Sequence, residues 1–307
     1  MKKLLNKFYC ETKLGFTLLQ PLFNIIEYFR YGLISDEKKL RSEFILNLGY
    51  EPDFENPKTL SEKIQWLKLN DRTSLHTQCA DKYAVRDYVT QVIGKKYLVP
   101  LVFQSKNIRD INPKNIPDYP VIVKTNHDSS GGQIIRNKAE VDWLILQNRL
   151  GKYLNINYYY RFKEWQYKNV EKRVLVEKLL LDKNGNIPND YKMYFINGKL
   201  LFTLVDIDRF TNHRRNLYDT NWELMEVRLK RENGRAIEKP EAFDEMKRLG
   251  EKLAKPFSFI RVDFYFFNDT IFFGEMTFHP NSGICKFIPY KYDAIFGEKL
   301  HLHKTKV

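Results

Sequence analysis

The sequence predicts an α+β fold, in which helices near the N-terminus precede antiparallel strands. Leucine and phenylalanine recur at helical intervals through residues 1–48. From residue 97 onward the pattern changes to short apolar runs bounded by turn residues, which indicates strands. Two turns, Asn197-Gly198 and Asn268-Asp269, each join two such runs and therefore predict β-hairpins.

Composition indicates a folded protein with a strongly basic surface. The chain has 307 residues, of which 43% are hydrophobic and 15% aromatic, enough for a sizeable core. Lysine and arginine number 51 against 38 acidic residues, which gives a formal net charge of +13. Such a field attracts nucleic acid, an anionic membrane or a polyanionic substrate. Because the basic residues are dispersed and no nucleic-acid motif is present, no nucleic-acid partner is expected.

The sequence favours a cytoplasmic protein. The most apolar stretch, Leu14–Ile34, is interrupted by polar residues and a proline, so no membrane-spanning helix is expected. The first residues show no secretory signal. Cys10, Cys79 and Cys285 are few and widely spaced, without a C-x-x-C pair, which is typical of a reducing compartment and excludes a cysteine-based zinc site.

The helical part begins with a basic amphipathic segment, residues 1–48. Two explanations stay open for its apolar face, namely contact with a membrane surface and packing on the protein's own body. After a proline-broken stretch, Thr59 or Ser61 can cap a helix at Glu62–Leu69. A further helix is predicted from about Thr77 to Ile93.

Strands are predicted next, at Leu98–Phe103 and Val121–Thr125. The second carries Lys124 late in an apolar run, directly before a loop that contains Ser129–Gly132. Small loop residues let backbone N–H groups approach a phosphate, and a lysine beside them supplies the matching charge. An ordinary hairpin turn into a returning strand at residues 133–136 is the alternative.

The middle of the chain alternates between helix and hairpin. Residues 139–169 are predicted to form helix, and Arg173–Leu181 a buried strand. The turn at 197–198 joins strands at Asp190–Ile196 and Lys199–Asp206. The polar run Asp208–Arg215 is predicted to be a loop. An amphipathic helix follows at residues 240–255.

The last hairpin, Phe259–Phe267 with Thr270–Phe278, carries the most informative polar residues. Alternation puts Asp263 on one face of its strand and Glu275 on one face of the next. If the two carboxylates meet across the ladder, they can hold Mg²⁺, which is usually bound by one or two carboxylates plus phosphate. The alternative is a solvent-facing side of the hairpin, but acids within such aromatic strands are costly to bury without a cation.

Four motifs occur in order along the chain, and they carry a resemblance to a known family. They are Asn56–Lys68 (NPKTLSEKIQWLK), Asp81–Arg86 (DKYAVR), Asp206–His213 (DIDRFTNH) and Gly274–Pro280 (GEMTFHP). With the glycine-rich hairpin after Lys124, they resemble ATP-grasp proteins, and more narrowly the TupA-like group named for a teichuronopeptide biosynthesis protein. The similarity covers roughly residues 35 to 290.

The resemblance implies an ATP-grasp fold, in which small α/β lobes hold ATP between two antiparallel sheets. It divides the chain into an N-terminal helical segment (1–48), an N-terminal α/β lobe (49–120), a small ATP-grasp lobe (121–180) and a large lobe with the metal-binding hairpin (181–307).

The resemblance also assigns roles to residues. The expected nucleotide contacts are Lys82, Lys124, Ser129, Ser130, Gly131, Gly132 and Glu177. The expected metal ligands are Asp263, Glu275 and Thr277, with Arg261 near the γ-phosphate. Thr277 stands where the broader family commonly has asparagine, and His279 and Asn281 are alternatives to it.

A polar group upstream is the candidate acceptor site. Arginine pairs bidentately with carboxylate or phosphate, so we expect Lys192, Arg209, Arg214 and Arg215 to bind an anionic acceptor. His213 is a candidate to accept a proton from an incoming amine.

The resemblance predicts an ADP-forming carboxylate–amine ligase of polysaccharide biosynthesis. ATP and Mg²⁺ would be its cofactors, and it would join a carboxyl-bearing sugar of a capsule or other cell-envelope polysaccharide to an amino acid or small amine. The partners would be a small or lipid-linked glycan carboxylate and an amine donor. A peripheral contact of the protein with the inner face of the membrane would fit a lipid-linked acceptor. The alternatives are a glycosyltransferase using the D-x-D of residues 206–208, and a nucleotide-binding assembly protein without turnover.

Overall fold

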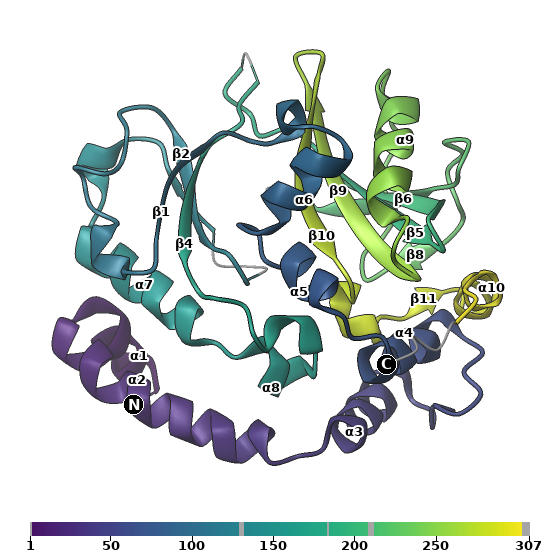
Figure 1. The fold of residues 1–307 in the computed structure, drawn as a ribbon, viewed down its shortest axis with the longest axis horizontal. Coiled ribbons are helices and arrows are strands. Elements are labelled where there is room, and N and C mark those ends of the chain that lie inside the picture. The colour runs from purple at the N-terminus through teal and green to yellow at the C-terminus, as the bar shows by residue number, and fades with distance from the viewer. Residues whose placement is uncertain (1, 129–131, 183, 208–211, 303–307) are drawn as a thin grey trace.

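The computed structural model describes residues 2–128, 132–182, 184–207 and 212–302, and it confirms the predicted α+β class (Figure 1). The α-helices are α1 (Lys2–Glu11), α2 (Lys13–Glu27), α3 (Asp36–Leu48), α4 (Leu60–Asn70), α5 (Ser74–Ala80), α6 (Val85–Val92), α7 (Trp143–Asn155), α8 (Tyr158–Phe162), α9 (Phe243–Ala254) and α10 (Lys291–Lys299). A π-helix, η1 (Tyr28–Gly32), continues α2. The short 3₁₀ helices are η2 (Lys95–Tyr97), η3 (Ile108–Asp110), η4 (Lys138–Glu140), η5 (Trp165–Tyr167) and η6 (Pro280–Gly283).

Two antiparallel sheets dominate the fold, as expected from the sequence. The strands are β1 (Leu101–Ser105), β2 (Val121–Thr125), β3 (Gln133–Ile135), β4 (Val174–Lys178), β5 (Asp190–Ile196), β6 (Lys199–Ile207), β7 (Arg214–Tyr218), β8 (Arg228–Leu229), β9 (Phe259–Phe267), β10 (Thr270–Thr277) and β11 (Phe287–Ile288). The smaller sheet has the order β1-β4-β2-β3 and the larger one β10-β9-β5-β6-β7, while β11 and β8 pair separately. Figure 1 shows the two sheets side by side, with α5 and α6 between them.

One face of the larger sheet is predominantly apolar. Val262 and Phe264 of β9 are fully buried there, together with Met193 of β5, against residues of α9, α5 and α6. Burial of each such side chain stabilises the fold by about 1.5–3 kcal/mol. The opposite face is divided. α4 and α10 cover it near Tyr194 and Leu204, and the remainder carries charged residues.

The predicted helix over residues 77–93 is wrong as a single element, because the chain leaves the helix at Asp81 and re-enters it at Val85. The Asp81 carboxylate accepts hydrogen bonds from the backbone N–H of Tyr83 and from the side-chain amide of Asn126, each at 2.8 Å. Such side-chain to backbone bonds compete with the helix. The break holds Lys82 in the turn between α5 and α6, beside the end of β2.

The predicted helix over residues 139–169 is also divided. Asp142 caps α7 by accepting from Ile145 N, and Asn157 caps α8 by accepting from Tyr160 N. The second cap starts a new helix in a new direction. The predicted cap of the helix after residue 59 is confirmed, because Thr59 and Glu62 form a capping box at the start of α4.

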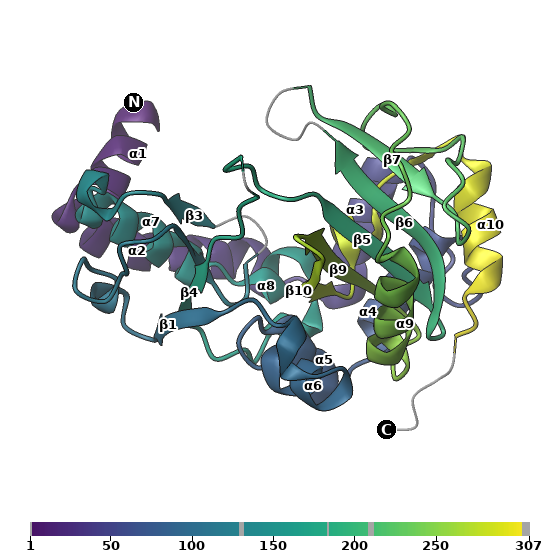
Figure 2. The ribbon, with the colours of Figure 1, turned by 90° about the horizontal axis from the view of Figure 1, so that it is seen from above.

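The predicted helical character of residues 1–48 is confirmed, and one side of this segment packs on the protein's own body. Phe16 and Phe23 both contact Tyr9, and Phe16 lies against Gly151 of α7. Figure 2 shows α1 and α2 beside α7, at the end of the molecule that holds the smaller sheet. Among the described residues, no helix combines the length and apolarity needed to cross a membrane.

Candidate functional site

A β-bulge in β10 determines which residue opposes Asp263. A regular ladder extending from the turn at residues 268–269 would pair Gly274 with Asp263. Instead the register shifts between Phe273 and Glu275, so that Glu275 lies opposite Asp263. Gly274 stands outside the ladder, and a Cβ there would lie 3.1 Å from the Asp263 carbonyl oxygen and from the Tyr265 ring. The bulge therefore brings the two carboxylates to one face.

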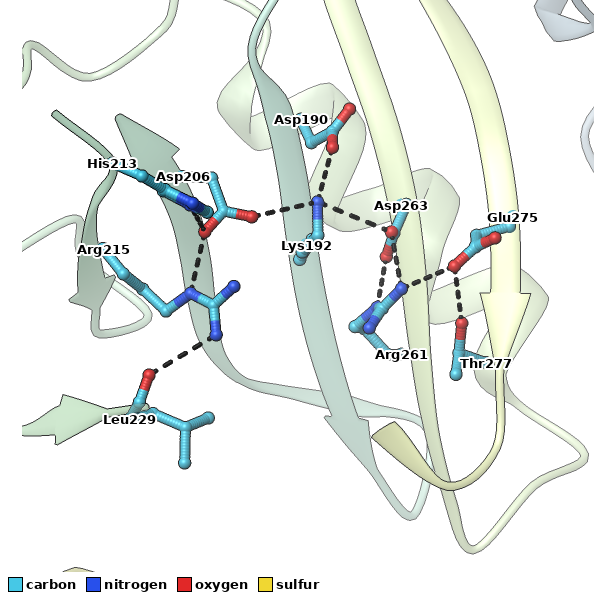
Figure 3. Close-up of polar contacts among 10 residues, drawn as sticks. All are labelled: Asp190, Lys192, Asp206, His213, Arg215, Leu229, Arg261, Asp263, Glu275 and Thr277. Atoms are coloured by element: carbon cyan, nitrogen blue, oxygen red, sulfur yellow. Dashed lines mark hydrogen bonds and ion pairs between the residues drawn. The ribbon is translucent and has the colours of Figure 1, made fainter. Parts of the chain in front are cut away.

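Arg261 joins the two carboxylates (Figure 3). Its Nε donates to Asp263 Oδ1 at 2.6 Å, and its Nη2 donates to both Asp263 Oδ2 at 2.8 Å and Glu275 Oε1 at 2.6 Å. Thr277 Oγ1 donates to the same Glu275 oxygen at 2.9 Å. The three residues expected to bind metal are thus brought together, with two carboxylates directed at one cationic nitrogen.

This donor set fits Mg²⁺, which prefers hard oxygen ligands. Burial raises the pKa of Asp263 to about 6 even though Arg261 and Lys192 act against it, so this carboxylate would gain from a further cation. Burial would also raise the pKa of Glu275, but Lys82 and Arg261 outweigh it and lower that pKa to about 2. Across the described segments no group of three His, Cys, Asp or Glu side chains is arranged to hold a metal ion, so a metal here would take further ligands from phosphate or water.

Lys192 of β5 is surrounded by carboxylates from three strands. Its Nζ lies 2.6 Å from Asp190, 3.6 Å from Asp206 and 3.9 Å from Asp263. Burial would lower the pKa of this lysine, but Asp263 and Asp190 outweigh it and raise that pKa. Figure 3 shows the resulting row of charges across the sheet, from Glu275 on β10 to Arg215 on β7.

Asp206 of β6 forms the other end of this row. His213 Nε2 and Arg215 Nε each lie 2.8 Å from Asp206 Oδ1. Asp208, the second acid of the D-x-D motif, lies outside the described residues. The Asp206 carboxylate is therefore already held by His213, Arg215 and Lys192.

Replacing Asp206 with asparagine should give a pH-dependent loss of stability. Burial would raise the Asp206 pKa, but hydrogen bonds from Arg215 and His213, with the charge of Lys192, lower it from its usual 3.8. A lowered carboxyl pKa contributes stability above about pH 4 that is lost as the pH falls through the folded-state pKa. We expect the difference in unfolding free energy between wild type and Asp206→Asn to be smaller below about pH 4 than at pH 7. Urea unfolding at each pH measures it, and a difference that grew in acid would contradict the assignment.

Not all predicted acceptor residues meet. Arg214 pairs with Ile207 and Arg215 with Asp206, so alternation directs Arg214 to the face opposite Lys192 and Arg215. The predicted loop over residues 208–215 accordingly ends in strand β7. The predicted residues Arg209, Ser129, Ser130 and Gly131 lie outside the described residues, and Gly132 is exposed at the start of β3.

The smaller sheet contributes a second charged group. Lys124 Nζ of β2 lies 2.6 Å from Glu177 Oε2 of β4, and Arg86 of α6 lies 3.6 Å from Glu177 Oε1. The sequence predictions did not include Arg86 as a site residue. The feature of the sequence that could have indicated Arg86 is its position as the last residue of the Asp81–Arg86 motif.

Lys82 connects the two sheets. Its Nζ donates to the Asp128 carbonyl oxygen at 2.6 Å, in the loop after β2, and lies 3.5 Å from Glu275 Oε2 on β10. The α5–α6 turn therefore presents one cation to both the loop of the smaller sheet and the carboxylate pair of the larger one.

A strained turn follows β10. Asn281, Ser282 and Gly283 all have positive φ, of 50°, 58° and 69°. Gln65 Nε2 of α4 donates to the carbonyl oxygens of Ser282 and Gly283, and Lys68 Nζ donates to that of Ser282 at 2.8 Å. These contacts explain why Gln65 and Lys68 belong to the Asn56–Lys68 motif, although neither residue was predicted to have a role.

Three solved structures show a limited similarity to this chain. The D-alanine–D-alanine ligase from Bacillus anthracis is 17% identical, with a TM-score of 0.39 over 65% of this chain and 57% of that one. The corresponding ligase from Helicobacter pylori is 13% identical, with a TM-score of 0.44 over 81% and 68%. The ATP-grasp ligase PsnB is 10% identical, with a TM-score of 0.40 over 71% and 57%. The chain thus spans little more than half the length of two of these proteins.

A family model gives the decisive match. No curated protein matches the chain. The model of the TupA-like ATP-grasp family matches residues 62–301, which include both sheets and every charged group described above. The chain therefore belongs to the TupA-like ATP-grasp family.

Proposed function

We propose that the protein is an ATP-dependent, ADP-forming ligase that joins a carboxylate to an amine. The observation that carries this proposal is the arrangement around Lys82. Lys82 lies in the turn between α5 and α6. On one side of this turn is Lys124 of the smaller sheet, and on the other side is the carboxylate pair Asp263 and Glu275. A triphosphate with a divalent cation needs both kinds of group, because its oxygens pair with lysine while its metal binds carboxylates.

The nucleotide would lie between the sheets. Lys124 and Lys82 would contact phosphate oxygens, Ser129–Gly132 would close over the phosphates, and Glu177 would face the adenosine. The Bacillus anthracis ligase has been solved in complex with ATP, and PsnB with Mg and ADP. These complexes support ATP and Mg²⁺ as the cofactors of this chain.

Asp263 and Glu275 would hold the metal, with the Thr277 hydroxyl hydrogen-bonded beside them. When bound, Mg²⁺ supplies charge to the phosphate oxygens and orients them. Arg261 and Lys192 are the protein's own cations on this face. They would keep the terminal phosphate against the acceptor while a carboxylate oxygen attacks phosphorus and ADP leaves.

In the second step an amine nitrogen would attack the acyl carbon, phosphate would leave, and the amine would lose a proton. His213 would accept that proton, and its contact with Asp206 supports this role. If Nε2–H of the neutral ring donates to the carboxylate, Nδ1 keeps the lone pair that accepts a proton. Asp206 would then act as a positioning residue.

We propose a carboxyl-bearing sugar of a surface polysaccharide as the acceptor and an amino acid or small amine as the donor. The basic field of the chain, with its formal charge of +13, suits an anionic glycan. The family's name is the support for the polysaccharide context.

Purified protein incubated with ATP, Mg²⁺, uronic-acid glycans and candidate amines is expected to release ADP and phosphate in equal amounts. Omission of either the glycan or the amine should reduce release to the background rate. Release of AMP, or retention of all ATP across the acceptor panel, would overturn the acyl-phosphate route.

Lys124→Ala should weaken nucleotide binding more than acceptor binding. Loss of one charge-assisted phosphate contact costs about 1.5–3 kcal/mol, equivalent to a rise of roughly 10- to 100-fold in the Kd for ATP. Calorimetric titration with ATP and Mg²⁺ measures the effect, and the exposed Lys114→Ala is the matched control. A larger effect on glycan binding than on ATP binding would remove Lys124 from the phosphate site.

A further inference from the structure

The helix formed by α2 and η1 has an apolar stripe that no other part of the described structure covers. Its large side chains recur every three or four residues, so they lie along one side of the helix. Leu14 is 62% exposed, Leu18 60% and Phe29 66%. This outer stripe consists of Leu14, Leu18, Leu22, Ile25, Ile26, Phe29 and Leu33. It covers 20 positions, or roughly 30 Å of helix.

The outer stripe is not an unfinished core, because the opposite side of the same helix is already packed. Phe16 and Phe23 both contact Tyr9, and Tyr9 is only 3% exposed. Asn148 of α7 donates to the carbonyl oxygen of Thr12 at 3.2 Å, which fixes the start of α2 on the body of the protein. The helix therefore has two apolar sides, one facing α7 and one facing outward.

The N-terminal segment that carries the outer stripe is predominantly basic. Residues 1–34 contain five lysines and arginines against two glutamates. Both glutamates have basic partners within the chain, since Glu27 pairs with Arg161 and Glu11 lies 3.9 Å from Lys7. Lys13 and Arg30, near the two ends of the stripe, are exposed, and neither forms an ion pair within the described part of the chain. The outward charge is therefore positive.

We propose that the outer stripe binds the surface of an anionic lipid bilayer, with the α2–η1 helix lying parallel to the membrane plane. A helix of this kind buries its apolar side at the boundary between headgroups and acyl chains, and its flanking cations pair with acidic lipids. Phe29 and the neighbouring exposed Tyr28 are residues favoured at that boundary.

Charge favours the bilayer over a second copy of the chain. Pairing two identical stripes would place the positive ends of one helix against those of the other, on two bodies that each carry +13. An acidic bilayer instead supplies both the apolar layer and the opposite charge.

Sedimentation of the full chain with lipid vesicles tests this proposal. The protein is expected to pellet with phosphatidylcholine vesicles containing about one-third phosphatidylglycerol, and to pellet much less with phosphatidylcholine alone. The triple variant Leu14→Gln, Leu18→Gln, Leu22→Gln should weaken binding by more than about tenfold. Because these side chains are exposed, the substitution opens no cavity, and an unchanged melting temperature verifies the fold.

Two further variants separate the apolar contribution to vesicle binding from the electrostatic one. Leu46→Gln, Leu144→Gln, Leu224→Gln removes three exposed leucines elsewhere and should bind as wild type does. Lys13→Glu with Arg30→Glu should abolish the preference for acidic vesicles. Binding unchanged in the stripe variant would overturn the proposal. The proposal would also be overturned if the wild-type protein did not bind vesicles and sedimented as a dimer, while the stripe variant sedimented as a monomer. ADP release in solution is a separate readout, so failure here leaves the proposed ligase activity intact.

Discussion

Glu275→Gln is expected to reduce Mg²⁺-dependent ADP release by at least about 100-fold. Glutamine keeps the shape of the side chain and can still accept the hydrogen bonds from Arg261 and Thr277, but it removes one of the two negative charges of the Asp263–Glu275 pair. The remaining carboxylate, Asp263, would hold a divalent cation alone. The measurement is the rate of ADP release against Mg²⁺ concentration at saturating ATP.

Two controls make the Glu275 result specific. The exposed Glu226→Gln removes the same charge elsewhere and should leave the rate unchanged. The melting temperature of Glu275→Gln should fall by only a few degrees, because its hydrogen bonds are retained. Turnover near the wild-type rate in a folded Glu275→Gln protein would refute the metal assignment.

Lys192→Met should produce the largest loss of stability among single substitutions on this face. The lysine is the shared cation of Asp190, Asp206 and Asp263, and its side chain is only 12% exposed. Removing one partner of a buried ion-paired group costs about 3–5 kcal/mol, because the remaining charges are left uncompensated. In a chain of this length, that corresponds to a fall in Tm on the order of 5–10 °C. Thermal unfolding at pH 7 measures the effect.

The neighbouring strand offers a matched control. Lys199 of β6 also pairs with a carboxylate, Glu251, but its side chain is 80% exposed, so Lys199→Met should cost less than about 1 kcal/mol. Adding Asp190→Asn to Lys192→Met should restore part of the lost stability, since it removes a charge that the lysine had neutralised. If the two substitutions were additive, the network description of Lys192 would be wrong.

The hairpins could be predicted almost to the residue, because turn chemistry and alternating hydrophobicity are local signals. The strands on either side of residues 197–198 and 268–269 begin and end within one residue of their predicted bounds. The long helices could not be predicted as well. Whether the chain breaks at Asp81 depends on Asn126, which is distant in sequence and supplies the competing hydrogen bond. Such tertiary contacts override local helical preference.

The site could be predicted in composition but not in every orientation. Lys124, Glu177, Asp263 and Glu275 lie in the two charged groups that the sequence indicated. Arg214 lies on the other face of its strand, which depends on a β7 register that the polar run after β6 did not reveal. The bulge at Gly274 did leave a trace in the sequence. The buried residues switch from odd positions, at 271 and 273 of β10, to even ones, at 276 in β10 and 278 directly after it.

Because of that bulge, loss of one residue from the hairpin and gain of one residue should have different consequences. If Gly274 were lost, Glu275 would follow Phe273 directly and still oppose Asp263, so the polarity of both faces would be preserved in a regular ladder. If one residue were added beside Gly274 and both joined a regular ladder, Glu275 would stay on the charged face but would oppose Arg261 instead of Asp263. Natural variation at this point of the family's hairpin should therefore favour loss of one residue over insertion of one residue, because only the loss keeps Glu275 opposite Asp263.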